Sequence, residues 1–399
     1  MKFNLNQFLM AVSLALDFVE IDIRGRSTNH GKRVAYAALR IAEKLGFKDE
    51  DLYDIVSLAI LHDNGICEAS SRDVKDETNE EERKIEHCII GENNIVNYPF
   101  LKKRVDIIKY HHEAYDGTGF YKLKGSQTPI ISQIIFFADY LENKFELDKI
   151  DANNRKEIRN FVMEQSGKIF NPEICSIFLQ LESNESFILD FKDNFINLAL
   201  SRGVHEFDLE LSLKEILNIT DVFSKIIDSK SKFTRRHSKG IAEKAGIMAD
   251  YYKYAEEEKT KLIIAANLHD LGKLAIPNTI LDSPRKLTED EFYMIKSHTY
   301  YTRAALSQID GFEDITEWAS NHHEKLNGAG YPYGKKGDEL DFNSRLMGCI
   351  DIYQALTEER PYRKPLKHTT VMNIMNDMVQ GGYIDGSIVS DINFVFSLT

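Results

Sequence analysis

The chain contains one pattern of residues twice, at an almost constant spacing. His30 and His237 are 207 residues apart, and the stretches LHDNG (61–65) and LHDLG (268–272) are separated by the same number. A pair of adjacent histidines also recurs, 211 residues further along. A spacing that drifts by a few residues is typical of a duplicated domain whose loops differ in length. The 399 residues therefore predict two copies of one domain, each about 200 residues long.

The duplication reaches both ends of each copy. LNQFLMAVSLALDFVE (5–20) and LKEILNITDVFSKIID (213–228) both place apolar residues at helical spacing. A secretion signal would not recur in mid-chain, so we expect residues 5–20 to form the first helix of the first domain. The stretches GKIFNPEI and GGYIDGSI, near the end of each copy, also match. We place the two domains at residues 1–203 and 204–399.

The apolar periodicity predicts helices almost throughout. HGKRVAYAALRIAEKLG (30–46) and HSKGIAEKAGIMADYYKYA (237–255) have apolar faces with a period of 3.6 residues. TKLIIAANLHD (260–270) is apolar on nearly every side, as expected of a central buried helix. No long alternating pattern of a β-strand occurs. Proline and glycine gather in two stretches, 276–287 and 327–340, which we expect to be loops. The predicted fold class is all-α.

Composition narrows the range of partners. The chain has 50 basic and 63 acidic residues, a formal net charge of −13, which disfavours a surface for duplex nucleic acid. The apolar stretch near the N-terminus is too short to span a membrane. Four scattered cysteines form no CxxC pair and indicate a reducing compartment. We therefore expect a cytoplasmic protein with no membrane or duplex partner; a homodimer or a signalling partner stays open.

The second copy contains an ordered set of metal-binding residue types. A lone histidine is most often structural, but the chain has only 12 histidines and each copy places five in the same order. Imidazole and carboxylate together suit first-row ions such as iron, manganese or zinc, and the lack of thiolate disfavours a closed structural zinc site. The predicted ligands of this metal centre are His237, His269, Asp270, His298, His322, His323 and Asp351.

Adjacent ligands in this set favour two ions over one. If His322 and His323 lie on a helix, their side chains diverge by about 100° and suit one ion each. His269 can bind one ion while Asp270 bridges both. Two ions about 3.5–4 Å apart can lower the pKa of a bridging water and hold the oxygens of an in-line phosphoryl displacement. The pattern therefore predicts a two-metal centre for phosphoryl chemistry.

Three motifs of the second copy, HDLGK (269–273), HHEKLNGAGYP (322–332) and DIYQALTEERPYRKP (351–365), resemble the HD-GYP family of metal-dependent phosphodiesterases. The resemblance implies HD-type helical bundles, so the whole chain would be two of them in tandem. It also implies hydrolysis of a cyclic dinucleotide, chiefly cyclic di-GMP, with mixed 3',3'-cyclic GMP-AMP as the alternative. The product, a linear dinucleotide or GMP, stays open.

The resemblance also implies roles for individual residues. The seven residues named above become ligands of two ions, iron or manganese, with Asp270 as the bridge. Lys273 joins Asp270 as a catalytic residue, because its charge would lie near the scissile phosphate. Substrate-binding positions are Arg360, Arg363 and Tyr331, and guanidinium groups suit phosphate oxygens. Glu324 is expected to orient a histidine. Some members have a glutamate for a third ion where this chain has Phe233.

The first copy keeps the ligand types but not the substrate residues. Ile66 stands at the position of Lys273, and Phe120 and Tyr121 replace the Tyr-Pro pair. Asp148 and Asp151 fall opposite the two arginines, and carboxylates at these positions would repel a phosphodiester. We therefore expect a degenerate first domain and an active second one, and leave open whether the first copy binds metal through His30, His62, Asp63, His87, His111, His112 and Asp139. A non-catalytic module that binds metal or nucleotide and acts through a partner is the alternative of another class.

Overall fold

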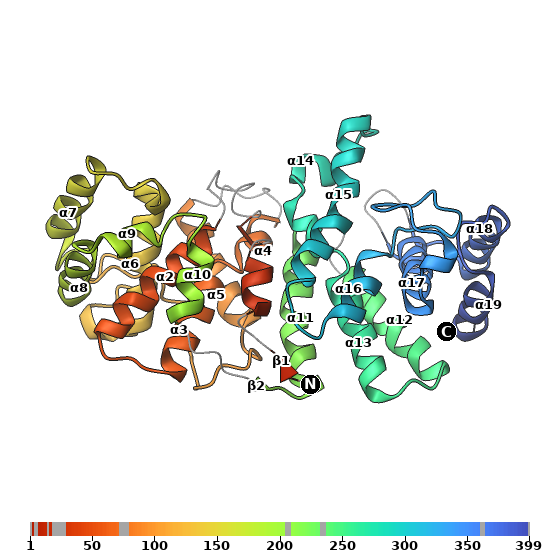
Figure 1. Ribbon diagram of the computed structural model, residues 1–399, viewed down its shortest axis with the longest axis horizontal. Coiled ribbons are helices and arrows are strands. Elements are labelled where there is room, and N and C mark those ends of the chain that lie inside the picture. The colour runs from red at the N-terminus through yellow and green to blue at the C-terminus, as the bar shows by residue number, and fades with distance from the viewer. Residues whose placement is uncertain are drawn as a thin grey trace. The chain divides into compact units, whose positions relative to one another are not determined.

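The chain folds into two compact units of helices (Figure 1). The computed structural model describes residues 2–3, 7–13, 16–17, 29–71, 80–203, 209–231, 237–359 and 364–397. One unit contains residues 4–208, and the other contains residues 209–399 together with residues 1–3. The N-terminal residues join the second unit because the two-residue strands β1 (Lys2–Phe3) and β2 (Leu209–Glu210) pair antiparallel. All other regular elements in the described ranges are helical, so the all-α prediction is confirmed.

The first unit is built around α2 (His30–Lys44), which is buried along most of its length. It packs against α3, α6, α8 and α10. Residues 7–13 and 16–17 are helical, in the stretch predicted to form the first helix. The other helices of this unit are α3 (Glu50–Ile60), α4 (Ile66–Ser71), α5 (Glu80–Asn94), α6 (Ile130–Phe145), α7 (Asn154–Gln165), α8 (Pro172–Glu182), α9 (Glu185–Leu189) and α10 (Ile196–Gly203).

The second unit is built around α13 (Glu256–Leu268), which packs against α11, α12 and α16. Leu262 and Ile264 to Ala266 on this helix have no exposed surface, which confirms the predicted central helix. The other helices are α11 (Leu213–Ser229), α12 (His237–Tyr251), α14 (Asn278–Leu281), α15 (Glu289–Leu306), α16 (Glu313–Ser320), α17 (Phe342–Thr357), α18 (His368–Gln380) and α19 (Gly386–Phe396).

Six helices of each unit follow the same order, which is the duplication seen at the level of structure. The pairs are α2 and α12, α3 and α13, α5 and α15, α6 and α17, α7 and α18, and α8 and α19. The second unit has α16 just before its histidine pair, where the described backbone of the first unit forms bends and turns. Equivalent helices therefore deliver equivalent side chains to each unit's centre.

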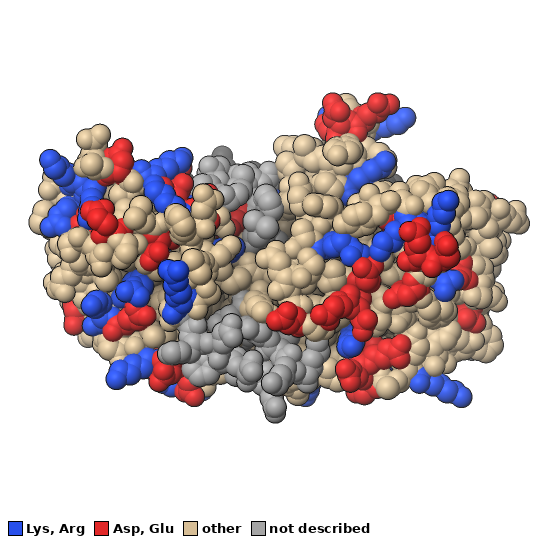
Figure 2. Space-filling model, in the orientation of Figure 1, with Lys and Arg blue, Asp and Glu red and all other residues tan. Residues whose placement is uncertain are grey.

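Local signals fix where the helices of the second unit begin. Ser212 and Thr288 cap α11 and α15 with reciprocal bonds to Glu215 and Glu291, the capping-box arrangement. The Asp341 side chain accepts from the Ser344 amide and sets the start of α17. Within the described ranges, no helix combines the length and apolar character that crossing a bilayer requires. On the face shown in Figure 2, basic and acidic side chains are interspersed over each unit.

Candidate metal centre

Five segments of the second unit bring the predicted ligands together. His237 opens α12, His298 lies inside α15 and Asp351 lies inside α17. The other ligands lie in two turns: His269 and Asp270 just after α13, and the histidine pair just after α16. The seven predicted residues fall into three overlapping groups of three, each with ligand atoms within 4.8 Å of one another: His237, His269 and Asp351; His269, Asp270 and His322; and His298, His322 and His323.

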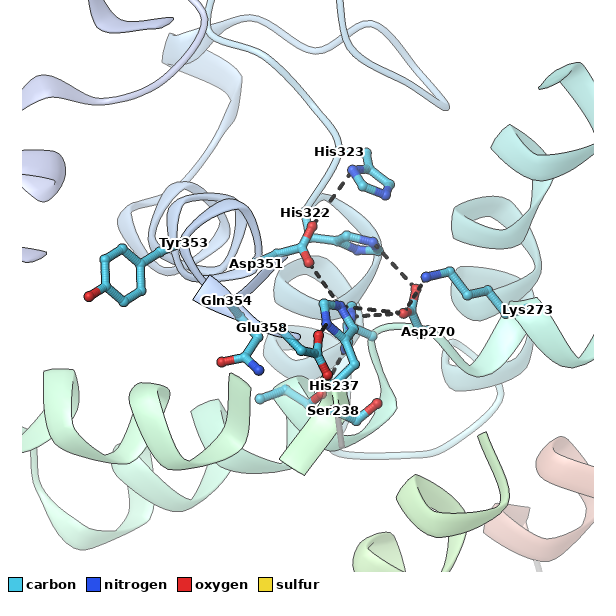
Figure 3. A network of polar contacts seen from close by, with 12 residues as sticks. His237, Ser238, Asp270, Lys273, His322, His323, Asp351, Tyr353, Gln354 and Glu358 are labelled. Carbon is cyan, nitrogen blue, oxygen red and sulfur yellow. Dashed lines mark hydrogen bonds and ion pairs between the residues drawn. The ribbon is translucent and has the colours of Figure 1, made fainter. Parts of the chain in front are cut away.

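Asp270 faces four histidines of this cluster from the side of Lys273 (Figure 3). Its Oδ2 lies 3.1 Å from His269 Nε2 and 4.0 Å from His237 Nε2. Its Oδ1 lies 3.4 Å from His298 Nε2 and 3.9 Å from His322 Nε2. The two oxygens of one carboxylate therefore face two different pairs of imidazoles, which is the arrangement that a bridging ligand needs.

Two buried atoms of the cluster have no hydrogen-bond partner. They are His269 Nε2 and Asp270 Oδ1, and both residues are at most 1% exposed. A buried polar atom left unpaired costs about 1–3 kcal/mol, so such atoms call for an explanation. A divalent cation bound between them would accept a lone pair from each, and imidazole with carboxylate is a donor set that first-row ions favour. The residues present fit a metal centre.

Asp351 completes the cluster from α17. Its Oδ1 lies 3.1 Å from His237 Nε2, and its Oδ2 lies 3.9 Å from His323 Nδ1. Figure 3 shows Asp351 and Asp270 facing the cluster from opposite sides. Each carboxylate therefore contacts histidines from more than one segment, which ties α12 and α17 to the two turns.

The histidine pair does not lie on a helix, contrary to the sequence-based expectation. The helix α16 ends at Ser320, and His322 and His323 lie in the turn that follows. Their rings are 4.2 Å apart between centroids, and both belong to one group with His298. The expectation that the pair lies on a helix was therefore wrong, and the division of the pair between two ions stays a prediction without that support.

Backbone carbonyls fix the orientation of three ligands. The Nδ1 atoms of His269, His298 and His322 lie 2.8, 2.6 and 2.7 Å from the carbonyl oxygens of Ala266, Ile295 and Ala319, three residues upstream. With the proton on Nδ1, each Nε2 presents its lone pair to the centre. Burial also lowers the pKa of His298 to about 4 and that of His322 well below its usual value, so these imidazoles are neutral.

His237 is oriented by a carboxylate instead. Its Nδ1 lies 3.0 Å from Glu358 Oε2. Burial opposes a charge on this ring, but the bonds to Asp351 and Glu358 outweigh burial and raise its pKa to about 9. An ion at Nε2 would replace the proton that lies between His237 and Asp351. Sequence reasoning missed Glu358; its position seven residues after Asp351, two helical turns away, was the available signal.

Lys273 and Tyr331 lie beside the cluster, as expected. Lys273 Nζ donates to Asp270 Oδ2 over 2.5 Å. The effect of burial on Asp270 is outweighed by His269 and Lys273, so its pKa is well below the usual value and the carboxylate is ionised. The half-buried Tyr331 ring lies 4.9 Å from the His323 ring. Arg360, Arg363 and Phe233 lie outside the described residues.

Glycine in the HDLG motif permits a close approach of two segments. A Cβ on Gly272 would lie 2.0 Å from the carbonyl oxygen of His298. The Gly272 amide also donates to Thr302 Oγ1, which in turn donates to the His269 carbonyl. Glycine is therefore required for the turn that carries His269 and Asp270 to pack against α15.

Glu324 stabilises the loop after the histidine pair rather than a histidine. Its carboxylate oxygens accept from the backbone amides of Tyr333 (2.8 Å) and Lys335 (3.0 Å). The expected contact with a metal ligand was wrong, because the side chain points into the turn that contains Tyr331 and Pro332. Glu113 of the first unit accepts from Tyr121 and Leu123 in the same way.

A cavity of about 340 Å³ reaches Glu358, the partner of His237, and is lined by Lys239, Gly240, Glu243, Lys244, Gln354 and Glu358. At the positions equivalent to Gly240 and Gln354, the first unit has Arg33 and Glu142, which form a buried ion pair of 2.6 Å. Space beside Glu358 is therefore open in the second unit, whereas a charged side-chain pair takes the equivalent positions in the first.

The first unit also gathers its predicted ligands. Asp63 Oδ1 lies 3.3 Å from His87 Nε2, and Asp63 Oδ2 lies 3.5 Å from His62 Nε2. Asp139 Oδ1 lies 3.2 Å from His30 Nε2. The two candidate groups of this unit are His30, His62, Asp63 and Asp139, and His87, Cys88, His111 and His112. Sequence reasoning did not include Cys88.

Comparison with known proteins agrees with this geometry. Residues 28–144 and residues 221–388 each match a family model described as an HD domain. The 3'3'-cGAMP-specific phosphodiesterase 1 of Vibrio cholerae is 31% identical to this chain, over 96% of the chain and 90% of that protein. The chain belongs to the HD-GYP family of metal-dependent phosphodiesterases. The expected family membership is confirmed, and this HD-GYP protein contains two HD domains.

Two further relatives extend the comparison. A cyclic di-GMP phosphodiesterase of Thermotoga maritima is 33% identical over 42% of the chain and 45% of its own length. A crystal structure of a cyclic GMP-AMP specific phosphodiesterase of V. cholerae superposes with a TM-score of 0.67, at 23% identity, over 99% of this chain and 98% of that one. That likeness confirms the tandem HD-type fold.

Proposed function

We propose that the second unit of this HD-GYP protein hydrolyses a cyclic dinucleotide, and that mixed 3',3'-cyclic GMP-AMP is its substrate. The observation that carries the reaction type is the placement of Asp270 between two sets of imidazoles, with Lys273 at its Oδ2. The substrate proposal reverses the order of our sequence-based expectation, which put cyclic di-GMP first. It rests on the relative that is aligned across both units, which is named for cyclic GMP-AMP.

We assign the ions to iron or manganese. The ligand set offers five imidazoles and two carboxylates and no thiolate, which suits these metals better than magnesium or calcium. When bound, two such ions would supply a bridging water of lowered pKa. Asp270 would be a ligand of the ions, and the neutral rings of His298 and His322 are available to ligate.

The side chains around the cluster then position the phosphodiester. Lys273 places a cation beside Asp270, where an anionic phosphate would approach the centre, and its charge offsets the negative charge that develops there. Tyr331 covers His323 and narrows access on that side. The Glu324 bonds keep the Tyr331 loop in place. Arg360 and Arg363 remain proposed phosphate contacts.

The cavity at Gln354 would receive a base of the substrate. Lys244 Nζ donates to Gln354 Oε1 over 2.6 Å, which fixes the amide. A glutamine amide can both donate to and accept from the edge of adenine, whereas the glutamate at this position in the first unit could only accept when ionised. A neutral amide at this position can pair with the edge of a purine base.

The test is hydrolysis by the full-length protein, stripped of metal and reloaded with manganese or iron(II). The substrates are 3',3'-cyclic GMP-AMP, cyclic di-GMP and the generic diester bis(p-nitrophenyl) phosphate. We expect all three to be cleaved, with kcat/KM at least about 10-fold higher for cyclic GMP-AMP, a difference of ~1.4 kcal/mol in transition-state binding. Equal or faster turnover of cyclic di-GMP would reject the substrate proposal. Binding without hydrolysis of any diester would indicate the non-catalytic alternative.

A further inference from the structure

Cys88 lies among the histidines of the first unit. It is 1% exposed, and its Sγ is 3.6 Å from His87 Nε2 and 3.7 Å from His111 Nδ1. The equivalent residue of the second unit is Thr299, whose hydroxyl donates to the Lys296 carbonyl over 3.1 Å. At the edge of otherwise matching clusters, the first unit therefore has a thiol where the second unit has a hydroxyl.

A histidine that contacts this thiol has, on the other side of its ring, a buried nitrogen without a hydrogen-bond partner. His111 is fully buried, and its Nδ1 lies 2.6 Å from the Ile108 carbonyl, so the Nε2 carries the lone pair. That Nε2 has no hydrogen bond, and neither does the buried Nε2 of His112. Two buried imidazole nitrogens without hydrogen-bond partners, beside a thiol and a third imidazole, offer a donor set that suits a cation.

The distances also match those around a tetrahedral zinc ion. Bond lengths of about 2.3 Å for sulfur, 2.05 Å for nitrogen and 2.1 Å for oxygen put neighbouring ligand atoms about 3.6 Å apart for S and N and about 3.4 Å apart for N and O. The structure has 3.6 Å between Cys88 Sγ and His87 Nε2, and 3.3 Å between His87 Nε2 and Asp63 Oδ1, an atom outside the group of four. One ligand atom from each of His87, Cys88, His111 and His112 lies within 4.8 Å of the others, so the four side chains are gathered around one point.

We propose that the first unit holds a thiolate-bound zinc ion, ligated by His87, Cys88, His111 and His112. Four protein ligands fill a tetrahedral shell, and Asp63 stands at its edge, so no position is left for water or substrate. Thiolate selects zinc over manganese, whereas the second unit offers only nitrogen and oxygen. The first-unit site is therefore structural and closed, and this holds whichever dinucleotide the second unit hydrolyses.

The ion would join segments that are far apart in the sequence. His87 and Cys88 belong to α5, while the histidine pair lies in a turn more than 20 residues later. Binding that depends on the folded arrangement contributes directly to the free energy of folding. Zinc bound through a thiolate would therefore stabilise the fold of the first unit, whose residues at the substrate-binding positions differ from those of the second unit.

Cobalt spectroscopy of the full-length protein tests the proposal directly. Cobalt(II) loaded in place of zinc should give a thiolate-to-metal charge-transfer band in the near ultraviolet. The band should disappear in Cys88→Ser and persist in Cys175→Ser, a control that removes another buried cysteine of the same unit. No band in the cobalt-loaded wild type would overturn the proposal without any variant, and so would a band that survives Cys88→Ser.

Zinc retention provides the second measurement. Cys88→Thr, the residue of the second unit, should lose zinc to a competing chelator at a concentration at least about 10- to 100-fold lower than the wild type does, since loss of a mere outer partner already costs that much. Circular dichroism is the check on folding. Equal retention of zinc by the two proteins would contradict a thiolate ligand. This result does not depend on turnover, so it stays distinct from failure of the proposed phosphodiesterase activity.

Discussion

Asp270 and Asp63 are equivalent carboxylates with equivalent surroundings. Each lies in the turn after a central helix, and each faces imidazoles with both oxygens. Their neighbours differ: Asp270 accepts a bond from Lys273, and the first unit has Ile66 at that position. The same substitution in the two copies therefore separates the metal-binding role proposed for both units from the catalytic role proposed for Asp270.

Asp270→Asn should remove the bridge and stop catalysis. We expect hydrolysis of the cyclic dinucleotide to fall at least about 100-fold, together with loss of metal from the second unit, because an amide is a weaker ligand than a carboxylate. Asp63→Asn is the matched control and should keep measurable hydrolysis, because the first unit has Ile66 where the second has Lys273. Metal content and initial rates are the measurements; normal hydrolysis by both variants would contradict the two-metal assignment.

Glu358 gives a second prediction at the residue scale. Glu358→Gln keeps the shape of the side chain but weakens the bond that orients His237. Loss of such an outer partner typically lowers metal affinity about 10- to 100-fold. Competition with a chromophoric chelator measures the affinity, and Glu339→Gln, at an exposed position, is the control. If the metal affinity of Glu358→Gln is unchanged, Glu358 does not contribute to the metal centre.

At the scale of elements, apolar periodicity predicted α2 and α12, and a run of residues apolar on nearly every side, 260–270, predicted α13. It could not predict that α16 ends just before the histidine pair, since the end depends on packing against other segments. It also missed α14, because Pro277 reads as a loop residue although proline is tolerated at the start of a helix.

Many contacts of the site link segments distant in sequence and carry no local signal. Glu358 reaches His237 across 121 positions, and Cys88 reaches His111 across 23. The ligand types and their order could be recognised in the sequence because the duplication presents them twice. The cavity beside Gln354 could not be predicted from the sequence, because it forms where Gly240 of α12 lies next to α17.

A substitution at Gly272 tests whether the turn after α13 must lie close to α15. Gly272→Ala puts a Cβ where the His298 carbonyl lies, so the turn or α15 must shift. We expect loss of about 2 kcal/mol or more in the free energy of unfolding, since no flexible side chain can yield, together with weaker metal binding. Gly246→Ala is the control: its Cβ meets only Ile263 and Lys259 side chains, and alanine in a helix should stabilise by about 0.5–1 kcal/mol. Equal effects in urea denaturation would contradict the close-approach argument.

At the scale of the whole molecule, one fold is present twice with different chemistry. Both units gather five histidines and two aspartates. The second adds Lys273 and a cavity at Glu358, while the first adds Cys88 and the buried pair of Arg33 and Glu142. Residues that favour substrate access thus occur in one unit, and residues that favour a closed site occur in the other.

This division leads to the last prediction, which concerns metal exchange in the intact protein. A mild chelator should remove ions from the second unit first, because its ligands are only nitrogen and oxygen and a cavity reaches Glu358, the partner of His237. Hydrolysis should then be lost while zinc stays bound to the first unit. Manganese or iron(II) should restore the rate, whereas magnesium or calcium should not, since hard cations favour oxygen ligands over five imidazoles. Metal analysis and rates at each step are the measurements. Full activity with magnesium alone, in protein shown to contain no other metal, would mean that the histidines are not the ligands that matter for catalysis.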